Sequence, residues 1–253
     1  MLDIQRQFGR QAHRYARSYI HRRGRSLAAV LELADARDGD LALDVGTGAG
    51  FTALGVAERA RRVIATDITP EMLAQTRRLA GRRRLANVEL GLAAAEGLPF
   101  VDAAIGLVTC RLAAHHFRDV PRALAEFRRV TKPGGRVVVC DTVSPEDEAV
   151  AAYMHDLELR RDLSHVRNLN VSTWRRLLAE AGLRLLEERL AKTPQEFEEW
   201  VGRSNTAPAA VPSLRRDLER ASAAARRIFG IRVRGRTIRW AWDNAIFLTV
   251  REP

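Results

Sequence analysis

The chain has 253 residues, 46% of them hydrophobic, which is enough to build one well-buried α/β domain. It contains no run of 18 apolar residues, so no helix is expected to span a membrane, and Met1 to Arg6 show no apolar signal region, so we expect a cytoplasmic protein. The two cysteines, Cys110 and Cys140, exclude a disulfide framework and are expected to be buried small side chains.

The net charge of +11 raises the question of a nucleic-acid partner. Arginine carries nearly all of the positive charge, because the only lysines are Lys132 and Lys192. Most arginines are scattered, and the two dense segments, residues 82–84 and 232–239, are not accompanied by an aromatic stacking platform. A solvated basic surface is therefore favoured, and a nucleic-acid partner is not expected, although the charge leaves RNA as an alternative.

The first predicted elements are helical. Apolar side chains, among them Tyr15, recur at helical spacing over residues 4–36. An apolar strand at residues 41–45 then breaks into a loop with Gly46, Gly48 and Gly50, and a helix follows at residues 51–60. Such a unit is typical of nucleotide-binding turns, because glycine lets the backbone approach a ligand and the helix offers its unpaired N–H groups.

An acid in front of this loop distinguishes it from a dinucleotide site. The spacing is G-x-G-x-G instead of G-x-G-x-x-G, and Asp44 lies inside the end of the strand, two residues before the first glycine. A carboxylate there repels a pyrophosphate but can pair with a cation. A ligand that combines adenosine with a positively charged amino acid therefore fits better than NAD.

A second acid stands where a bound ribose needs a hydrogen-bond acceptor. Residues 63–66 predict a second strand, and Asp67 follows it, about 20 residues after the glycine loop. Thr69 and Pro70 then predict the N-cap and the first residue of a helix that ends near Gly81. The two acids and the loop between them favour a nucleoside ligand.

The remaining chain continues to alternate between strands and helices. We expect strands at residues 87–92, 105–110 and 136–141, with a helix at 121–131. A helical insertion then extends to Arg161, Ser172 caps a helix that Gly182 ends, and strands at 183–190 and 244–250 flank a helical segment at 194–229. This alternation predicts a doubly wound α/β fold with its site at the carboxyl ends of the strands.

Five segments in this order resemble the class I S-adenosylmethionine (SAM) dependent methyltransferases, in particular the ubiquinone/menaquinone-biosynthesis-like (methyltransferase type 11) branch. They are residues 44–50, 66–73, 95–100, 110–117 and 129–135. The resemblance covers residues 40–142 and is looser toward both ends of the chain.

The resemblance implies a Rossmann-like, mostly parallel seven-stranded sheet with an antiparallel last strand and helical lid insertions. It implies one methyltransferase domain over residues 1–253, with an N-terminal helical cap at 1–36, a SAM-binding core at 40–142, and a substrate lid at 143–171 and 194–240. The cap is expected to lie over the mouth of the cofactor site.

The same match implies most of the residues expected to bind SAM, which are Asp44, Gly46, Thr47, Gly48, Gly50, Asp67, Ile68, Ala95, Glu96 and Arg111. Tyr15 of the cap is the remaining one, with a role in the core as the alternative. Two positions depart from the family pattern. Ala94 stands where relatives carry an acid for the adenine amino group, and Gly106 stands where they carry Asp. Losing one such hydrogen bond would cost about 1–3 kcal/mol of SAM binding, so a SAM-binding relative with weak or no catalysis stays an alternative.

Methyl transfer depends mainly on positioning, and a base helps only when the acceptor must lose a proton. His115 and His116 follow the fourth strand, and His165 lies in a loop between arginines; of these, His116 and His165 are our candidates for a catalytic base, with packing as the alternative role. No His, Cys and acid cluster has metal-ligand spacing. The expected reaction is methyl transfer to a small-molecule acceptor, for which an aromatic or quinone-like compound is one candidate. RNA methylation is the alternative, and the sequence leaves the acceptor atom and the oligomeric state open.

Overall fold

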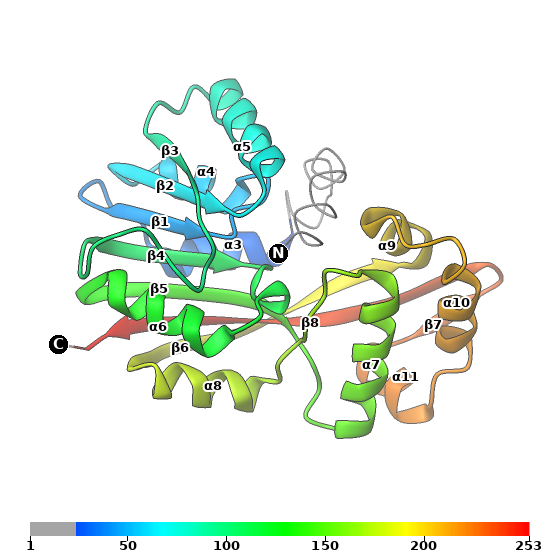
Figure 1. The fold of residues 1–253 in the computed structure, drawn as a ribbon. Coiled ribbons are helices and arrows are strands. Elements are labelled where there is room, and N and C mark those ends of the chain that lie inside the picture. Colours follow the sequence, from blue (N-terminus) through cyan, green and yellow to red (C-terminus); the bar gives the residue numbers. More distant parts are fainter. Residues whose placement is uncertain (1–23, 253) are drawn as a thin grey trace.

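The computed structural model describes residues 24–252 and contains one twisted sheet of eight strands (Figure 1). The strand order is β3-β2-β1-β4-β5-β8-β6, with β7 paired to β8 outside this path. The strands are β1 (Leu41–Val45), β2 (Arg62–Asp67), β3 (Val88–Leu92), β4 (Ile105–Arg111), β5 (Thr131–Val143), β6 (Leu183–Glu196), β7 (Arg232–Arg234) and β8 (Thr237–Arg251). β1 to β5 are parallel, and β8 runs antiparallel to β5 and β6. This confirms the doubly wound, mostly parallel sheet with a reversed last strand.

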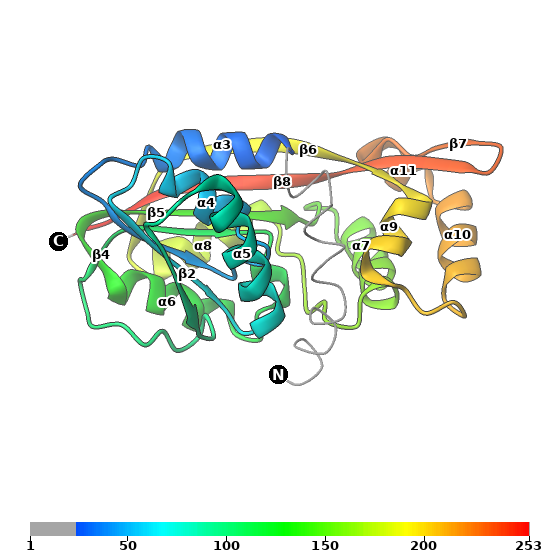
Figure 2. The ribbon, with the colours of Figure 1, turned by 90° about the horizontal axis from the view of Figure 1, so that it is seen from above.

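Helices cover both faces of this sheet. Successive residues of β1 point to opposite faces: Ala42 packs with α3 (Arg25–Ala34) and α4 (Phe51–Ala57), whereas Leu43 packs with α6 (Val120–Val130) and α8 (Val171–Glu180). In Figure 2, α3 and α6 lie on opposite sides of the sheet. Because both faces are covered, β1 and β4 are almost completely buried, which is why most of their residues are apolar.

The sheet is longer on one side than the sequence predicts. β6 continues to Glu196 instead of ending at residue 190, and β8 begins at Thr237 instead of residue 244. The extensions pair with each other, for example Thr193 with Trp242 and Gln195 with Trp240. The expected seven strands become eight because β7 forms a hairpin with β8 around Gly235, whose φ is +57°. The helical segment predicted to begin at residue 194 therefore begins at Phe197.

These extensions carry a second apolar cluster at the end of the molecule away from β3 (Figure 1). It is built by α7 (Glu148–Arg161), α9 (Phe197–Ser204), α10 (Val211–Glu219), α11 (Ala223–Phe229) and the start of β8. Trp240 meets Trp200 edge-on with ring centroids 5.1 Å apart, and Trp242 meets Phe229 in the same way at 4.6 Å. We refer to residues 143–171 and 194–240 as the lid, and this cluster is its core.

Two helix starts differ in detail from the prediction. The side chain of Asn170, not that of Ser172, caps α8 by accepting a hydrogen bond from the N–H of Thr173, while Ser172 bonds to Glu146. Thr69 is the N-cap of α5 (Pro70–Arg83) as expected, but its side chain makes no capping hydrogen bond. The carboxylate of Asp67 accepts from the N–H of Thr69 and holds this turn in place of the hydroxyl.

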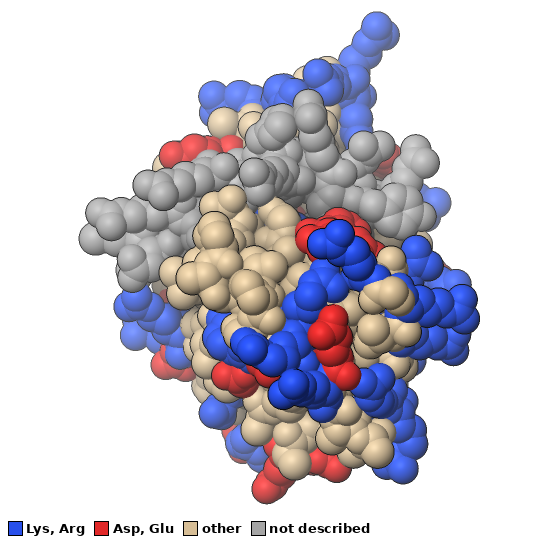
Figure 3. Space-filling model, turned by 90° about the vertical axis from the view of Figure 1, so that its right-hand side faces the viewer, with Lys and Arg blue, Asp and Glu red and all other residues tan. Residues whose placement is uncertain are grey.

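The arginines are spread over the surface. Figure 3 looks onto the lid end of the molecule, where blue side chains are interleaved with tan and red ones. Arg232, Arg234 and Arg239 are exposed along the β7–β8 hairpin, whereas Arg160 and Arg215 form ion pairs with lid carboxylates. Among residues 24–252, no helix is long and apolar enough to cross a membrane.

Candidate active site

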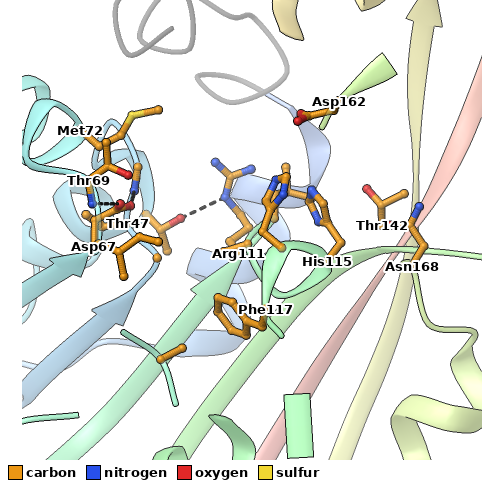
Figure 4. A pocket seen from close by; sticks show the side chains of 18 of the residues that line it. Thr47, Asp67, Thr69, Met72, Arg111, His115, Phe117, Thr142, Asp162 and Asn168 are labelled. Atoms are coloured by element: carbon orange, nitrogen blue, oxygen red, sulfur yellow. Dashed lines mark hydrogen bonds between the residues drawn. The ribbon is translucent and has the colours of Figure 1, made fainter. Parts of the chain in front are cut away.

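A cavity of about 540 Å³ opens at the carboxyl ends of β1, β2, β4 and β5 (Figure 4). One end is lined by the glycine loop, Asp67 and the segment after β3, and the other end by the lid. The residues between the two ends come from β4, from the 3-10 helix η1 (Ala114–His116) and from the end of β5. The cavity thus spans the predicted cofactor site and the predicted acceptor site.

Two glycines of the loop are required by geometry. Gly46 and Gly48 line the cavity with φ of +64° and +54°, in the region that disfavours residues with a Cβ atom. A Cβ atom on Gly46 would lie 2.6 Å from that of Ala113, whereas one on Gly48 would meet no atom within 4 Å and would enter open space. Gly50 was predicted to bind the cofactor, but it does not line the cavity; it packs against Thr76 of α5 at a φ of +86°.

Asp44 is buried beneath this loop. One carboxylate oxygen accepts from the hydroxyl of Thr109 at 2.6 Å, and the other from the hydroxyl of Thr47 at 2.6 Å and the N–H of Ala53 at 3.2 Å. Burial raises the pKa of Asp44 to about 6, although these hydrogen bonds act in the opposite direction. A cation bound in the cavity would favour its ionised form, which is the role that the sequence predicts.

Asp67 ends β2 with its carboxylate at the cavity wall. Its two oxygens accept from the N–H of Gly48 at 2.8 Å and from that of Thr69 at 2.9 Å. A carboxylate oxygen has more than one acceptor site, so each can also accept from a ribose hydroxyl. Burial raises the pKa of Asp67, an effect that hydroxyl donors would counteract.

The segment predicted to flank the adenine also lines the cavity. Ala94, Ala95, Glu96 and Ile68 are all in its wall. The carboxylate of Glu96 accepts from the N–H of Arg118 at 3.0 Å, which ties this segment to the loop after η1. Ala94 lines the cavity, so the acid that the family pattern has at this position is missing from the wall of the site.

Arg111 lies at the end of β4 between the glycine loop and η1. Its side chain is buried and donates from Nε to the hydroxyl of Thr52 at 3.0 Å, and it reaches Ser26 of α3 at 3.4 Å. It therefore holds α3 and α4 to the cavity wall and places a positive charge near Asp44. Tyr15, the remaining predicted cofactor residue, lies outside the described residues.

The structure joins His115 to an acid that the sequence analysis did not select. Nδ1 of His115 lies 2.6 Å from Oδ1 of Asp141, the last buried acid of β5, and the N–H of His115 donates to Oδ2 of the same carboxylate at 2.7 Å. Burial by itself lowers the pKa of His115, but the Asp141 carboxylate outweighs this effect and holds the pKa above its ordinary value. His115 lines the cavity between Arg111 on one side and Thr142 on the other (Figure 4).

The two histidines selected from the sequence lie in different settings. His116 lines the cavity, and its Nδ1 lies 3.0 Å from the carbonyl oxygen of Ser164, so a neutral ring donates from Nδ1. Burial and the neighbouring His115 lower its pKa to about 4. His165, the second candidate base, is buried and is not among the residues that line the cavity, and burial lowers its pKa to about 3.

The lid contributes a buried carboxylate at the far end of the cavity. Oε1 of Glu158 accepts from the indole N–H groups of Trp242 at 2.8 Å and Trp200 at 3.3 Å, and Oε2 accepts from Arg161 at 2.7 Å. Burial alone would raise the pKa of Glu158, but the charge of Arg161 brings it below its ordinary value. The carboxylate thus joins α7, α9 and β8 at the cavity wall.

Neutral polar side chains line the same cavity as this carboxylate and His115, together with the charged side chains of Arg161, Asp162 and Arg203. The neutral ones are Thr142, Asn168, Thr193, Gln195 and Asn244. Asn168 is 8% exposed, and within the described residues its buried Oδ1 has no hydrogen-bond partner. The sequence analysis missed Asn168 and Asp141. Nothing in the sequence around Asn168 marks it, but Asp141 ends a parallel strand as Asp44 and Asp67 do, and that position was a usable signal.

Comparison with known proteins identifies the family. A family model described as a methyltransferase domain matches residues 43–139. The uncharacterized methyltransferase YcgJ of Bacillus subtilis is 32% identical over 224 residues, which cover 88% of each chain. This chain belongs to the methyltransferase-domain family. The crystal structure of YcgJ superposes with a TM-score of 0.86 at 30% identity, over 90% of this chain and 98% of that one. A demethylmenaquinone methyltransferase of Thermobifida fusca is 38% identical, but over only 45% of this chain and 48% of its own.

The cofactor of this methyltransferase is SAM, and the cavity fits it. The glycine loop leaves open space where a Cβ atom on Gly48 would lie, the carboxylate of Asp67 lines the wall where it would accept from hydroxyl groups, and Asp44 in its ionised form would place a negative charge near a cationic amino acid. Among residues 24–252, no group of His, Cys, Asp and Glu is arranged to hold a metal ion.

Proposed function

We propose that this methyltransferase transfers the methyl group of SAM to a small-molecule acceptor that binds between η1 and the lid. Gly46, Gly48 and Asp67 would hold the cofactor at one end of the cavity, and the lid would select the acceptor at the other. The proposal places the acceptor beside His115, since that residue lies where the two ends meet. We further propose that residues 1–253 form one methyltransferase domain and that the protein is cytoplasmic, as the sequence predicts.

The observation that carries this proposal is the continuity of the cavity. Asp67 and Trp242 line the same cavity, although one ends β2 and the other lies on the extension of β8 that packs against the lid. A site that only binds SAM has no need for a second half with its own polar wall. A volume of about 540 Å³ falls in the range of small-molecule sites and must hold both reactants, which favours a small acceptor.

The experiment has two steps. Calorimetric titration with S-adenosylhomocysteine (SAH) should show one site per chain, and incubation with methyl-labelled SAM and a fractionated metabolite extract should label a small molecule. No binding of SAH at millimolar concentration would contradict the proposal. Binding without labelling of any fraction would favour the alternative of a SAM-binding relative without catalysis.

RNA methylation is the second candidate, and the exposed arginines of the β7–β8 hairpin are the observation in its favour. Binding through phosphates weakens steeply with salt, so retention of mixed RNA only at low salt would indicate charge alone. Labelled methyl groups on RNA at moderate salt would overturn the small-molecule proposal.

A further inference from the structure

His115 is held in place on three sides. Its N–H and its Nδ1 both bond to Asp141, as described above, and its carbonyl oxygen accepts from the N–H of Val166 at 2.8 Å and that of Arg167 at 3.2 Å. The first two contacts come from the sheet and the last two from the loop after α7. The backbone of His115 is therefore fixed by both halves of the molecule, and its ring cannot turn without breaking the bond to Asp141.

This arrangement fixes which ring nitrogen can act as a base. A carboxylate accepts hydrogen bonds, so the neutral ring carries its proton on Nδ1, opposite Asp141, and the lone pair stays on Nε2. Within the described residues, Nε2 of His115 has no hydrogen-bond partner, and the residue lines the cavity. Asp141 also stabilises the ring after it has accepted a proton, since it supplies the opposing charge at 2.6 Å.

The neighbouring wall indicates what the base faces. The amide of Asn168 has no partner among the described residues, although the residue is 8% exposed and its Oδ1 is buried. A buried polar group without a partner costs free energy unless a ligand or water satisfies it. Figure 4 shows Asn168 and Thr142 on the same side of His115. A neutral amide and a hydroxyl beside the base suit a neutral, polar acceptor better than a long apolar one.

We propose that the acceptor is a small, neutral, polar molecule with a nucleophilic hydroxyl group, and that His115, positioned by Asp141, is the catalytic base for that hydroxyl, with Asn168 bonding a second polar group. This rests on the proposed function. SAM supplies an electrophilic methyl group in this site. The acceptor oxygen forms a bond to the methyl carbon as the bond from sulfur to that carbon breaks, and the hydroxyl proton moves to Nε2 of His115. SAH leaves as a neutral thioether, and the His115 proton passes to solvent.

The groups around His115 set the pH at which it can serve. Asp141 on β5 is the direct partner, Glu158 and Asp162 face it from the lid, and the rings of His116 and His165 have their centroids 4.1 and 5.8 Å away. Because the acids raise the pKa of His115, the neutral, base-competent form is present only above that raised value. The rate should therefore fall as the pH decreases through it.

The first test needs no acceptor. Histidine ring resonances of the full chain with SAH bound are followed by NMR as the pH is varied, with His115→Asn to assign the signal. We expect the pKa of His115 to lie above the ordinary 6.5 and to fall in Asp141→Asn, while His165→Asn leaves it above 6.5. A titration at or below 6.5, or one that Asp141→Asn does not change, would overturn the assignment of His115 as the base.

The second test uses methyl-labelled SAM and a panel of polyols, phenols, hydroxy acids, amines and a menaquinone precursor. We expect the label on oxygen, and His115→Asn should lower turnover about 100-fold or more, as for a lost general base, with SAH affinity within twofold. His165→Asn, the control, should keep turnover within about threefold. Asp141→Asn should move the acid limb of the pH profile to lower pH, a change that a merely structural role would not cause.

The outcomes separate the two proposals. If the wild-type protein does not bind SAH, the proposed function itself is contradicted. With SAH binding intact, full turnover in His115→Asn overturns the base, and label on nitrogen, on carbon or on the quinone precursor overturns the hydroxyl acceptor. Activity toward an acceptor whose hydroxyl is already ionised at the assay pH should survive in His115→Asn, which supports the base directly.

Discussion

The cofactor end of the cavity is made largely of backbone, whereas the lid end is made of side chains. At the cofactor end, glycines with positive φ and a carboxylate that accepts two N–H groups shape the wall within short segments that follow β1 and β2. At the lid end, Glu158 bonds to two tryptophans and an arginine that lie up to 84 residues from it in the chain. Backbone turns leave a local sequence signature, and long-range side-chain contacts do not. The difference explains why the sequence reveals the glycine loop but not the contacts of Glu158.

The largest effect should come from breaking the lid end. Glu158→Ala removes the acceptor for two indole N–H groups and the partner of Arg161 in a buried position, which typically costs about 3–5 kcal/mol. We expect a large drop in the free energy of unfolding, measured in urea, while SAH affinity of the folded protein stays within about twofold. Glu180→Ala, which removes an exposed ion pair on α8, is the control and should change stability by no more than about 0.5 kcal/mol. Equal losses in both variants would show that the buried carboxylate has no special role.

Substitutions in the glycine loop should lower both SAH affinity and thermal stability. Gly46→Ala forces a Cβ atom into a left-handed turn, at about 1–2 kcal/mol, and against Ala113. Gly48→Ala carries the same backbone cost without a clash, and its Cβ enters open space. Gly46→Ala should therefore be the less stable of the two in thermal unfolding, and both should weaken SAH in calorimetry. A Gly46→Ala protein as stable as Gly48→Ala would mean that the loop can shift away from η1.

Removing the charge of Asp67 should weaken cofactor binding and leave the lid end of the cavity unchanged. Asp67→Asn keeps the shape but replaces charge-assisted hydrogen bonds, each worth about 1.5–3 kcal/mol, so SAH affinity should fall about tenfold or more. The pH dependence of His115 should be unchanged, because Asp67 lies at the other end of the cavity. Unaltered SAH affinity would remove Asp67 from the cofactor site.

The pKa of Asp44 predicts a pH dependence of cofactor binding. Its folded-state value of about 6 lies above the ordinary 3.8, so the buried carboxyl favours the folded state fully below pH 3.8 and loses that contribution as the pH rises through 6. A bound cation needs the ionised form, so SAH affinity should fall roughly tenfold from pH 7 to 5. Asp44→Asn should remove this dependence and be at least as stable at pH 7. If SAH affinity of the wild-type protein does not change between pH 7 and 5, the charge of Asp44 does not contribute to cofactor binding.

The smallest effect is expected from restoring an acid at the adenine end. Ala94 lines the cavity at the position where the family pattern has an acid for the adenine amino group. Ala94→Asp would restore that hydrogen bond and should tighten SAH binding severalfold. Ala36→Asp, outside the cavity wall, is the control. Weaker or equal binding in Ala94→Asp would mean that other groups hold the adenine.

Much of the fold and the cofactor end could be predicted because they depend on neighbours in the sequence. Runs such as residues 41–45 must be buried on both faces, and Gly46 and Gly48 mark a turn that other residues do not adopt easily. Asp44 and Asp67 are positioned by the ends of their own strands. Gly50 was expected to bind the cofactor, but this glycine packs against Thr76 outside the cavity lining. Thr76 is 26 residues away, and the sequence does not reveal that contact.

The sequence by itself determined that this chain is a doubly wound α/β protein with a nucleoside site after its first two strands, because periodicity, glycine and strand-end acids act locally. Only the tertiary structure decided which histidine meets an acid, how far β6 and β8 extend, and which side chains line the end of the cavity near the lid. Of the three histidines, only the ring of His115 lies within hydrogen-bond distance of Asp141, while that of His116 bonds to a carbonyl oxygen and His165 is buried outside the cavity lining. These differences arise from packing between distant segments, where burial and a single opposing charge set the pKa of each ring.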